Sequence, residues 1–144
     1  MKKELLIILL GLLSLNINAT TFYTVYKIDI INNGRITQQH TFNAIDAEYR
    51  IIEYDNSDLV LNNTSCFRIN NSFRIVRIND VLFIKNDYNI LNGKDKYKGT
   101  IYKRGEHNIT LFILSLADTD TEFHFYCVEY TYSGPWSASN SSQK

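Results

Sequence analysis

The sequence has no excess of either charge, and no long stretch of it is dominated by basic residues. Lysine and arginine number 15, aspartate and glutamate also number 15, and the formal net charge is zero. A protein whose main partner is nucleic acid or an anionic membrane needs concentrated positive charge. The densest basic stretch, residues 94–98, is typical of a solvated loop. We therefore expect neither of these partners.

The sequence also lacks the motifs of common catalytic and metal sites. It contains no H-E-x-x-H, no G-x-S-x-G and no glycine-rich phosphate loop. The three histidines, His40, His107 and His124, are scattered, and neither cysteine has the neighbours of a zinc or redox motif. These absences predict a protein that is not an enzyme, has no catalytic residues and uses no metal or cofactor.

A long apolar run occurs only at the N-terminus. Lys2 and Lys3 precede the apolar run 5–13, and the segment ends at Ile17-Asn18-Ala19. This order is typical of a secretory signal peptide, and the run is shorter than the roughly 20 residues that span a bilayer. We expect residues 1–19 to be cleaved and the product to be secreted, without membrane contact. A retained signal anchor is the alternative.

Cleavage would leave 125 residues with 13 basic and 14 acidic side chains, a net charge of −1. This length is typical of one domain, which we place at 20–136, followed by a polar tail at 137–144. Cys66 and Cys127 are the only cysteines. In an oxidising secretory route such a pair predicts one disulfide, which could stabilise the fold by about 4 kcal/mol. An intermolecular disulfide is the alternative.

Alternating apolar and polar residues predict β-strands over nearly the whole chain. Tyr26, Ile28 and Ile30 alternate with polar residues, an Asn-Asn-Gly turn follows, and a second extended stretch occupies 36–42, which predicts an N-terminal hairpin. Turn-forming residues separate the later strands, and no amphipathic helix occurs. The fold class is therefore all-β, a sandwich or a barrel. Further strands are expected at 49–54, 59–69, 73–78, 81–85, 99–103, 108–116 and 122–132.

The segment 109–127 resembles strands E and F of an immunoglobulin domain, in which an apolar strand leads through an aspartate-containing corner to the second cysteine. The resemblance implies an immunoglobulin-like β-sandwich with an extra N-terminal strand or hairpin. It places Cys66 on strand B, so that the disulfide to Cys127 joins the two sheets. Two usual marks of this fold are missing: Phe125 stands where antibody domains have a corner tyrosine, and no tryptophan follows Cys66 on the expected strand C.

Residues 73–85 and the sequence Phe125-Tyr126-Cys127-Val128 are similar to the secreted interleukin-18-binding proteins of mammals and poxviruses. In that family, aromatic side chains on two neighbouring strands hold the cytokine. A poxvirus-type member would be a decoy that sequesters host interleukin-18 and serves immune evasion. The resemblance implies four ligand-binding residues. Phe73 and Phe83 match the family's aromatic anchors, Arg77 stands where the family has an aromatic, and Lys85 replaces an acidic residue.

Several alternatives remain open at this point. Phe73 and Phe83 could be core residues, because aromatic side chains in strands are more often buried than exposed. A second aromatic group at 130–136 is another candidate binding patch. The chain could also be a decoy for a different cytokine or chemokine, or a surface β-domain for adhesion or self-association, including a homodimer. Sequons mark three candidate glycosylation sites on a secreted chain: Asn63, Asn70 and Asn108.

Overall fold

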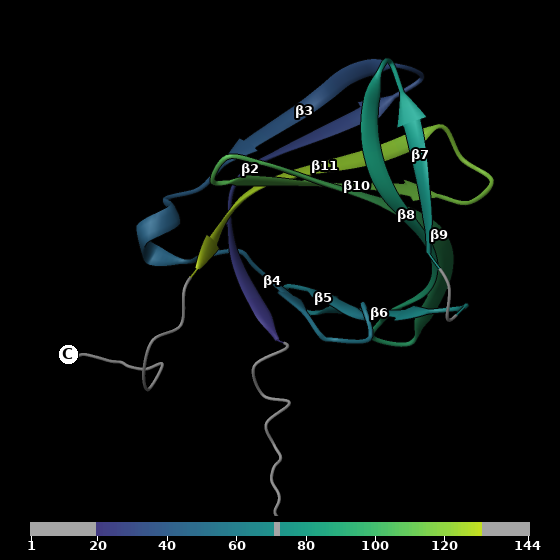
Figure 1. The fold of residues 1–144 in the computed structure, drawn as a ribbon, viewed down its shortest axis with the longest axis horizontal. Coiled ribbons are helices and arrows are strands. Elements are labelled where there is room, and N and C mark those ends of the chain that lie inside the picture. Colours follow the sequence, from purple (N-terminus) through teal and green to yellow (C-terminus); the bar gives the residue numbers. More distant parts are fainter. Residues whose placement is uncertain (1–19, 71–72, 131–144) are drawn as a thin grey trace, which may run out of the picture.

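The computed structural model describes residues 20–70 and 73–130, which form a single antiparallel sheet with one short 3-10 helix (Figure 1). The predicted signal peptide, the polar tail, and Tyr132 and Trp136 of the second aromatic group lie outside the described residues. In chain order the elements are β2 (Thr21–Asn32), β3 (Arg35–Thr41), η2 (Ala44–Asp46), β4 (Arg50–Glu53), β5 (Leu59–Leu61), β6 (Thr64–Arg68), β7 (Arg74–Ile78), β8 (Val81–Asn92), β9 (Asp95–Glu106), β10 (Ile109–Leu116) and β11 (Thr121–Tyr130).

The sheet closes on itself. Among the described strands, the first, β2, pairs with the last, β11, along nearly its whole length, and its other edge pairs with β4 over Thr21–Thr24. The result is an eight-stranded ring in the order β2, β11, β10, β9, β8, β6, β5 and β4. Figure 1 looks into this ring, with β4, β5 and β6 along the lower wall. Closure removes the free edges that an open sheet would expose along these strands.

Two strands lie outside the ring as arms. β2 pairs with β4 at its start and with β3 from Lys27 onward, so β3 extends the sheet beyond β4. In the same way β8 pairs with β7 over Val81–Lys85 and with β6 over Tyr88–Leu91. Because the long strands change neighbours halfway, β3 and β7 protrude from the ring at different places.

Side chains fill most of the barrel interior, as expected for eight strands. The fully buried residues include Val25, Ile51 and Phe112, and the ring of Tyr23 packs edge-on against Phe112 with ring centroids 5.2 Å apart. Large apolar residues inside the ring and polar residues outside it reflect the period-two alternation that predicted the strands. The complete buried apolar core consists of Tyr23, Val25, Ile28, Ile51, Leu59, Leu61, Cys66, Tyr88, Ile90, Ile101, Phe112, Leu114, Phe125 and Cys127.

The all-β class is confirmed, but the architecture is a closed barrel and not the expected immunoglobulin-like sandwich. In an immunoglobulin domain, strands E and F belong to different sheets. Here the corresponding strands, β10 and β11, pair directly with each other, with Ile109 opposite Val128 and Ser115 opposite Glu122. The assignment of these segments to strands E and F is therefore wrong, because the chain between them forms a tight turn rather than a crossing between two sheets.

The predicted disulfide is absent from the structure, in which Cys66 and Cys127 are free, buried thiols. Cys66 lies on β6 and Cys127 on β11, and these strands are four positions apart in either direction around the eight-stranded ring. The width of the barrel therefore separates the two residues, whereas a disulfide needs Cα atoms within about 7 Å. Burial raises the pKa of the Cys66 thiol to about 12, and burial also raises the pKa of Cys127.

The predicted N-terminal hairpin is present as β2 and β3. Its turn uses Asn33 and Gly34 with positive φ angles of 52° and 78°, as a two-residue hairpin turn requires. Other boundaries were wrong: β8 continues to Asn92 and β9 begins at Asp95, so most of the stretch 94–98 belongs to a long hairpin and not to a loop. Among the described residues, no helix is long and apolar enough to span a membrane.

Candidate functional site

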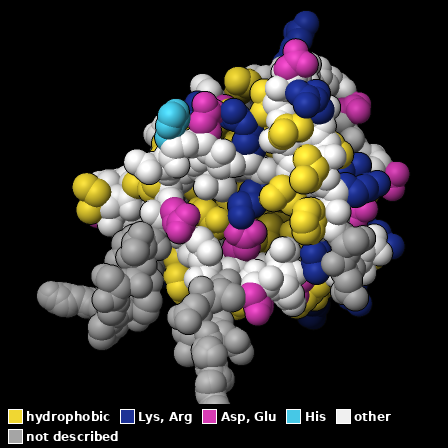
Figure 2. Space-filling view, viewed as in Figure 1, with side chains coloured by type: hydrophobic (Ala, Val, Ile, Leu, Met, Phe, Trp, Pro, Cys, Tyr) yellow, Lys and Arg dark blue, Asp and Glu magenta, His cyan; other side chains and the backbone are white. Residues whose placement is uncertain are grey.

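The arm formed by β7 and the start of β8 carries several exposed large apolar side chains close together. Residues Val81–Phe83 pair with β7 alone, because the pairing of β8 with β9 begins at Ile84. Among the described strands, no third strand therefore pairs with this end of the hairpin. Figure 2 shows hydrophobic side chains gathered over β7 and the adjoining part of β8.

One face of this arm carries three exposed aliphatic side chains. Ile75 is 65% exposed, Leu82 is 52% exposed and Ile84 is 38% exposed. Ile75 lies directly opposite Ile84, and Arg77 lies directly opposite Leu82, so all four side chains are on the same face of the hairpin. Exposed aliphatic residues that adjoin one another, unlike single ones, mark surfaces that contact another molecule. We call this set of side chains the arm face.

The four predicted ligand-binding residues are divided between two faces. Phe73, 54% exposed, immediately precedes β7 and by alternation shares the side of Ile75, as does Arg77. Phe83 and Lys85 lie opposite Val76 and Arg74, and therefore on the other face. The structure thus does not bring the four residues together.

Phe83 is a packed residue on the outer wall of the barrel. It is 7% exposed, and its ring meets Tyr102 edge-on at a centroid distance of 6.2 Å. The Lys85 ammonium lies 5.8 Å from the centre of the same Tyr102 ring. Burial of Phe83 agrees with the alternative that it is a structural residue, because a side chain covered by its own sheet cannot anchor a partner.

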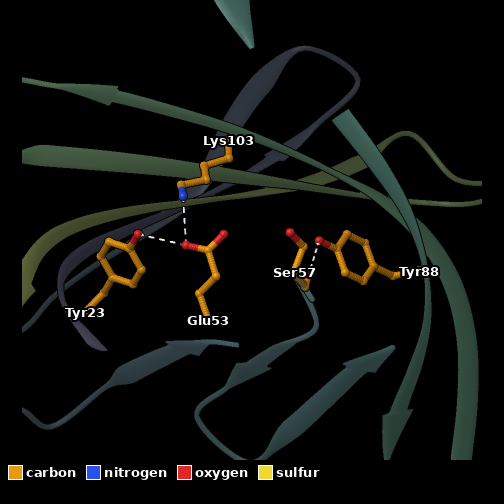
Figure 3. A network of polar contacts seen from close by, with 5 residues as sticks. All are labelled: Tyr23, Glu53, Ser57, Tyr88 and Lys103. Atoms are coloured by element: carbon orange, nitrogen blue, oxygen red, sulfur yellow. Dashed lines mark hydrogen bonds and ion pairs between the residues drawn. The ribbon is translucent and has the colours of Figure 1, made fainter. Parts of the chain in front are cut away.

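A polar network lies inside the ring beside the arm face (Figure 3). The Tyr23 hydroxyl donates a hydrogen bond of 2.9 Å to Glu53 Oε1, and Lys103 Nζ approaches the same oxygen at 2.7 Å. Lys103 pairs in register with Ile84, which places the network next to the arm face. Burial, and then the Glu53 carboxylate, raise the pKa of Tyr23 far above its ordinary value, so this hydroxyl keeps its proton and stays a donor.

Asn86 adds an unsatisfied acceptor to this end of the barrel. It lies opposite the buried Ile101 and therefore points inward, and it is 7% exposed. Its Oδ1 has no hydrogen-bond partner among the described residues. Tyr88, two positions along β8, donates a 2.8 Å hydrogen bond to the carbonyl of Ser57. Within the same part of the chain, no three histidine, cysteine, aspartate or glutamate residues are grouped to hold a metal ion.

Sequence reasoning identified Phe73 and Arg77 but missed Ile75, Leu82 and Ile84 as surface residues. The signal that could have identified them was the alternation of side chains between the two faces of the strands on both sides of the Asn79-Asp80 turn. Both turn residues have positive φ angles. This pattern alone could not tell which face the barrel would cover. The candidate glycosylation residues Asn63, Asn70 and Asn108 are all exposed outside the strands, which leaves that prediction open.

No protein-family model matches this chain, and no curated protein or solved structure matches it with statistical significance. The similarity of residues 73–85 and 125–128 to interleukin-18-binding proteins therefore stays a prediction drawn from the residues themselves.

Proposed function

We propose that this chain is a secreted binding domain that captures a protein partner through the arm face, with a cytokine as the partner class and interleukin-18 as the first candidate. The observation that carries the proposal is the exposed cluster of Ile75, Leu82 and Ile84, with Phe73 beside it. Buried apolar anchors surrounded by polar groups supply most of the affinity in protein interfaces. Binding would act by covering the surface of the cytokine that its receptor uses.

The composition of the arm face indicates what the partner surface should contain. Arg77 lies among the aliphatic side chains and would be desolvated with them, so it needs an acidic group on the partner. The partner surface should therefore combine an apolar pocket with a nearby carboxylate. Lys85, which was predicted to take part, is assigned no role because it lies on the opposite face.

The test is a binding titration of the purified protein against interleukin-18, other interleukins and chemokines. Ile75→Glu places a charge at the centre of the arm face and should weaken binding at least tenfold, which corresponds to about 1.4 kcal/mol. Ile36→Glu is the matched control because Ile36, 55% exposed, lies on the other arm strand, β3. No binding to any member of the panel at micromolar concentration would reject a cytokine partner. Equal losses in both variants would move the site away from the arm face.

A second function, self-association, is favoured by the exposed edge of β3. All seven residues of Arg35–Thr41 are exposed, and in the described part of the chain this strand pairs with β2 alone. An unpaired strand edge is a template for a strand from a second chain. Sedimentation would distinguish the two functions: a dimer that Gln39→Pro converts to monomer would support self-association through β3, and a concentration-independent monomer would exclude it.

A further inference from the structure

The barrel has an apolar pocket at the end opposite to the Glu53 network. Tyr97 lines this pocket, whereas Lys103, six residues further along the inward face of β9, belongs to the network. Six residues of extended strand span about 20 Å, so the two sites occupy opposite ends of the interior. The pocket has a volume of about 380 Å³. This lies in the range of about 300 to 1,000 Å³ that is typical of small-molecule sites.

Two apolar walls define the pocket. One is aromatic: the rings of Tyr49 and Phe125 stack with centroids 5.8 Å apart, and Phe123 stacks on Phe125 at 6.4 Å. The other wall is mostly aliphatic. Apart from His40, which lies on β3, the lining side chains come from strands of the closed ring or from the segment leading into β4, so the pocket is formed by the fold itself. The full lining is Ile28, Ile30, His40, Tyr49, Leu61, Thr64, Ile90, Asn92, Tyr97, Leu114, Leu116, Phe123 and Phe125.

The polar groups of the lining restrict the chemistry of an occupant. None of the thirteen residues is acidic, and none is a lysine or arginine. A cationic head group would find no carboxylate there, whereas His40, Thr64 and Asn92 can each donate a hydrogen bond to an oxygen. The lining therefore matches a molecule with a long apolar body and one oxygen-bearing end.

We propose that this pocket binds a medium-chain fatty acid. The acyl chain lies between the aromatic and aliphatic walls. The carboxylate lies beside Thr64 and Asn92, which are neighbours at the ends of the paired strands β6 and β8, and accepts hydrogen bonds there. Burial of the chain supplies the binding free energy through the hydrophobic effect, and the absence of acidic residues avoids repulsion of the head group. This site is independent of the arm face, so either one can exist without the other.

Fluorescence titration with a dansyl-labelled undecanoic acid tests the proposal on the purified protein. We expect saturable enhancement of the dansyl emission, displacement by decanoic acid, and weaker displacement by decylamine, which has the same chain and a cationic head. Leu116→Trp fills the pocket and should weaken binding at least tenfold. Ile36→Trp adds the same side chain at an exposed position outside the pocket and should leave binding unchanged.

Three results would overturn the proposal: no saturable enhancement with the wild-type protein, displacement by decylamine as strong as that by decanoic acid, or equal binding by the Leu116→Trp and wild-type proteins. If Leu116→Trp does not fold, Thr64→Phe offers a second filling variant in the turn-proximal part of β6. Binding by a folded Thr64→Phe protein with unchanged affinity would contradict the proposal in the same way.

Discussion

A single methyl group added at Gly99 should destabilise the barrel. Gly99 lies on β9 between Tyr88 of β8 and Leu116 of β10, and it is buried. A Cβ atom there would lie 2.9 Å from the carbonyl oxygen of Ser115 and 3.0 Å from the terminal methyl groups of Ile90 and Leu114. The Ser115 oxygen belongs to the backbone of β10 and cannot move without shifting the strand. Gly99→Ala therefore forces either the backbone or the packed core to move.

Gly105→Ala is a matched control on the same strand. Its added Cβ would have the Thr110 hydroxyl as its nearest neighbour at 4.0 Å, an ordinary contact. Both substitutions restrict the unfolded chain equally, which by itself stabilises by about 0.4 to 1 kcal/mol. Overpacking a core costs about 1 to 3 kcal/mol. The free energies of unfolding of the two variants should therefore differ by about 1 to 3 kcal/mol, with Gly99→Ala the less stable.

Urea unfolding followed by far-ultraviolet circular dichroism measures this difference. With a denaturant dependence of about 2 kcal/mol/M, the midpoints of the two variants should lie roughly 0.5 to 1.5 M apart. Equal midpoints would refute the reasoning, because they would show that the chain around Gly99 has room for a side chain and that β8, β9 and β10 are not packed as described.

Three further predictions concern the thiols, the buried tyrosine and the ion pair. When the protein is unfolded in guanidinium without reductant, both Cys66 and Cys127 should react with a thiol reagent. In the folded protein neither cysteine should react. Unreactive cysteines in the unfolded chain would indicate a disulfide. The free energy of unfolding should fall as the pH rises above about 9 to 10. Burial raises the pKa of Tyr49 to about 12 and that of Cys66 to about 12, so the unfolded chain releases protons that the folded chain retains. Urea midpoints between pH 8 and 11 measure this fall, Tyr49→Phe should make it less steep, and a flat wild-type profile would contradict it. Lys103→Met should destabilise by about 1 to 2 kcal/mol because the mostly buried Glu53 carboxylate loses its cation, and a Glu53→Gln/Lys103→Met double variant should recover part of that loss in the same assay.

Local sequence patterns were sufficient for most of the strands and for the first hairpin, although they placed the end of β8 and the start of β9 wrongly. Alternation at Tyr26, Ile28 and Ile30 predicted β2, and the Asn33-Gly34 turn specified a two-residue connection to β3. These features depend on neighbours in the chain, and the required backbone angles are set by the turn residues themselves. Phe73 was identified as a candidate contact residue, and it is exposed beside the arm face.

The sequence did not predict which face of the β7–β8 hairpin is exposed and which is buried. Phe73 and Phe83 look alike in the sequence, yet one is exposed and the other is covered by Tyr102, which comes from another strand. Which face becomes buried depends on the strand that packs there, and that strand is about 20 residues away. The same limit applies to the pocket, whose walls come from eight strands and the chain before β4.

What the sequence determined by itself was the all-β class, because period-two alternation and turn residues act between near neighbours. What only the tertiary structure decided was the closure of the sheet into a barrel. That closure is a pairing between β2 and β11, the first and last of the described strands, and a half-buried strand has the same alternation in a sandwich as in a barrel. The pairing also placed Cys66 and Cys127 on opposite walls and opened a pocket at one end of the core. Contacts between residues about 100 positions apart leave no local mark on the sequence.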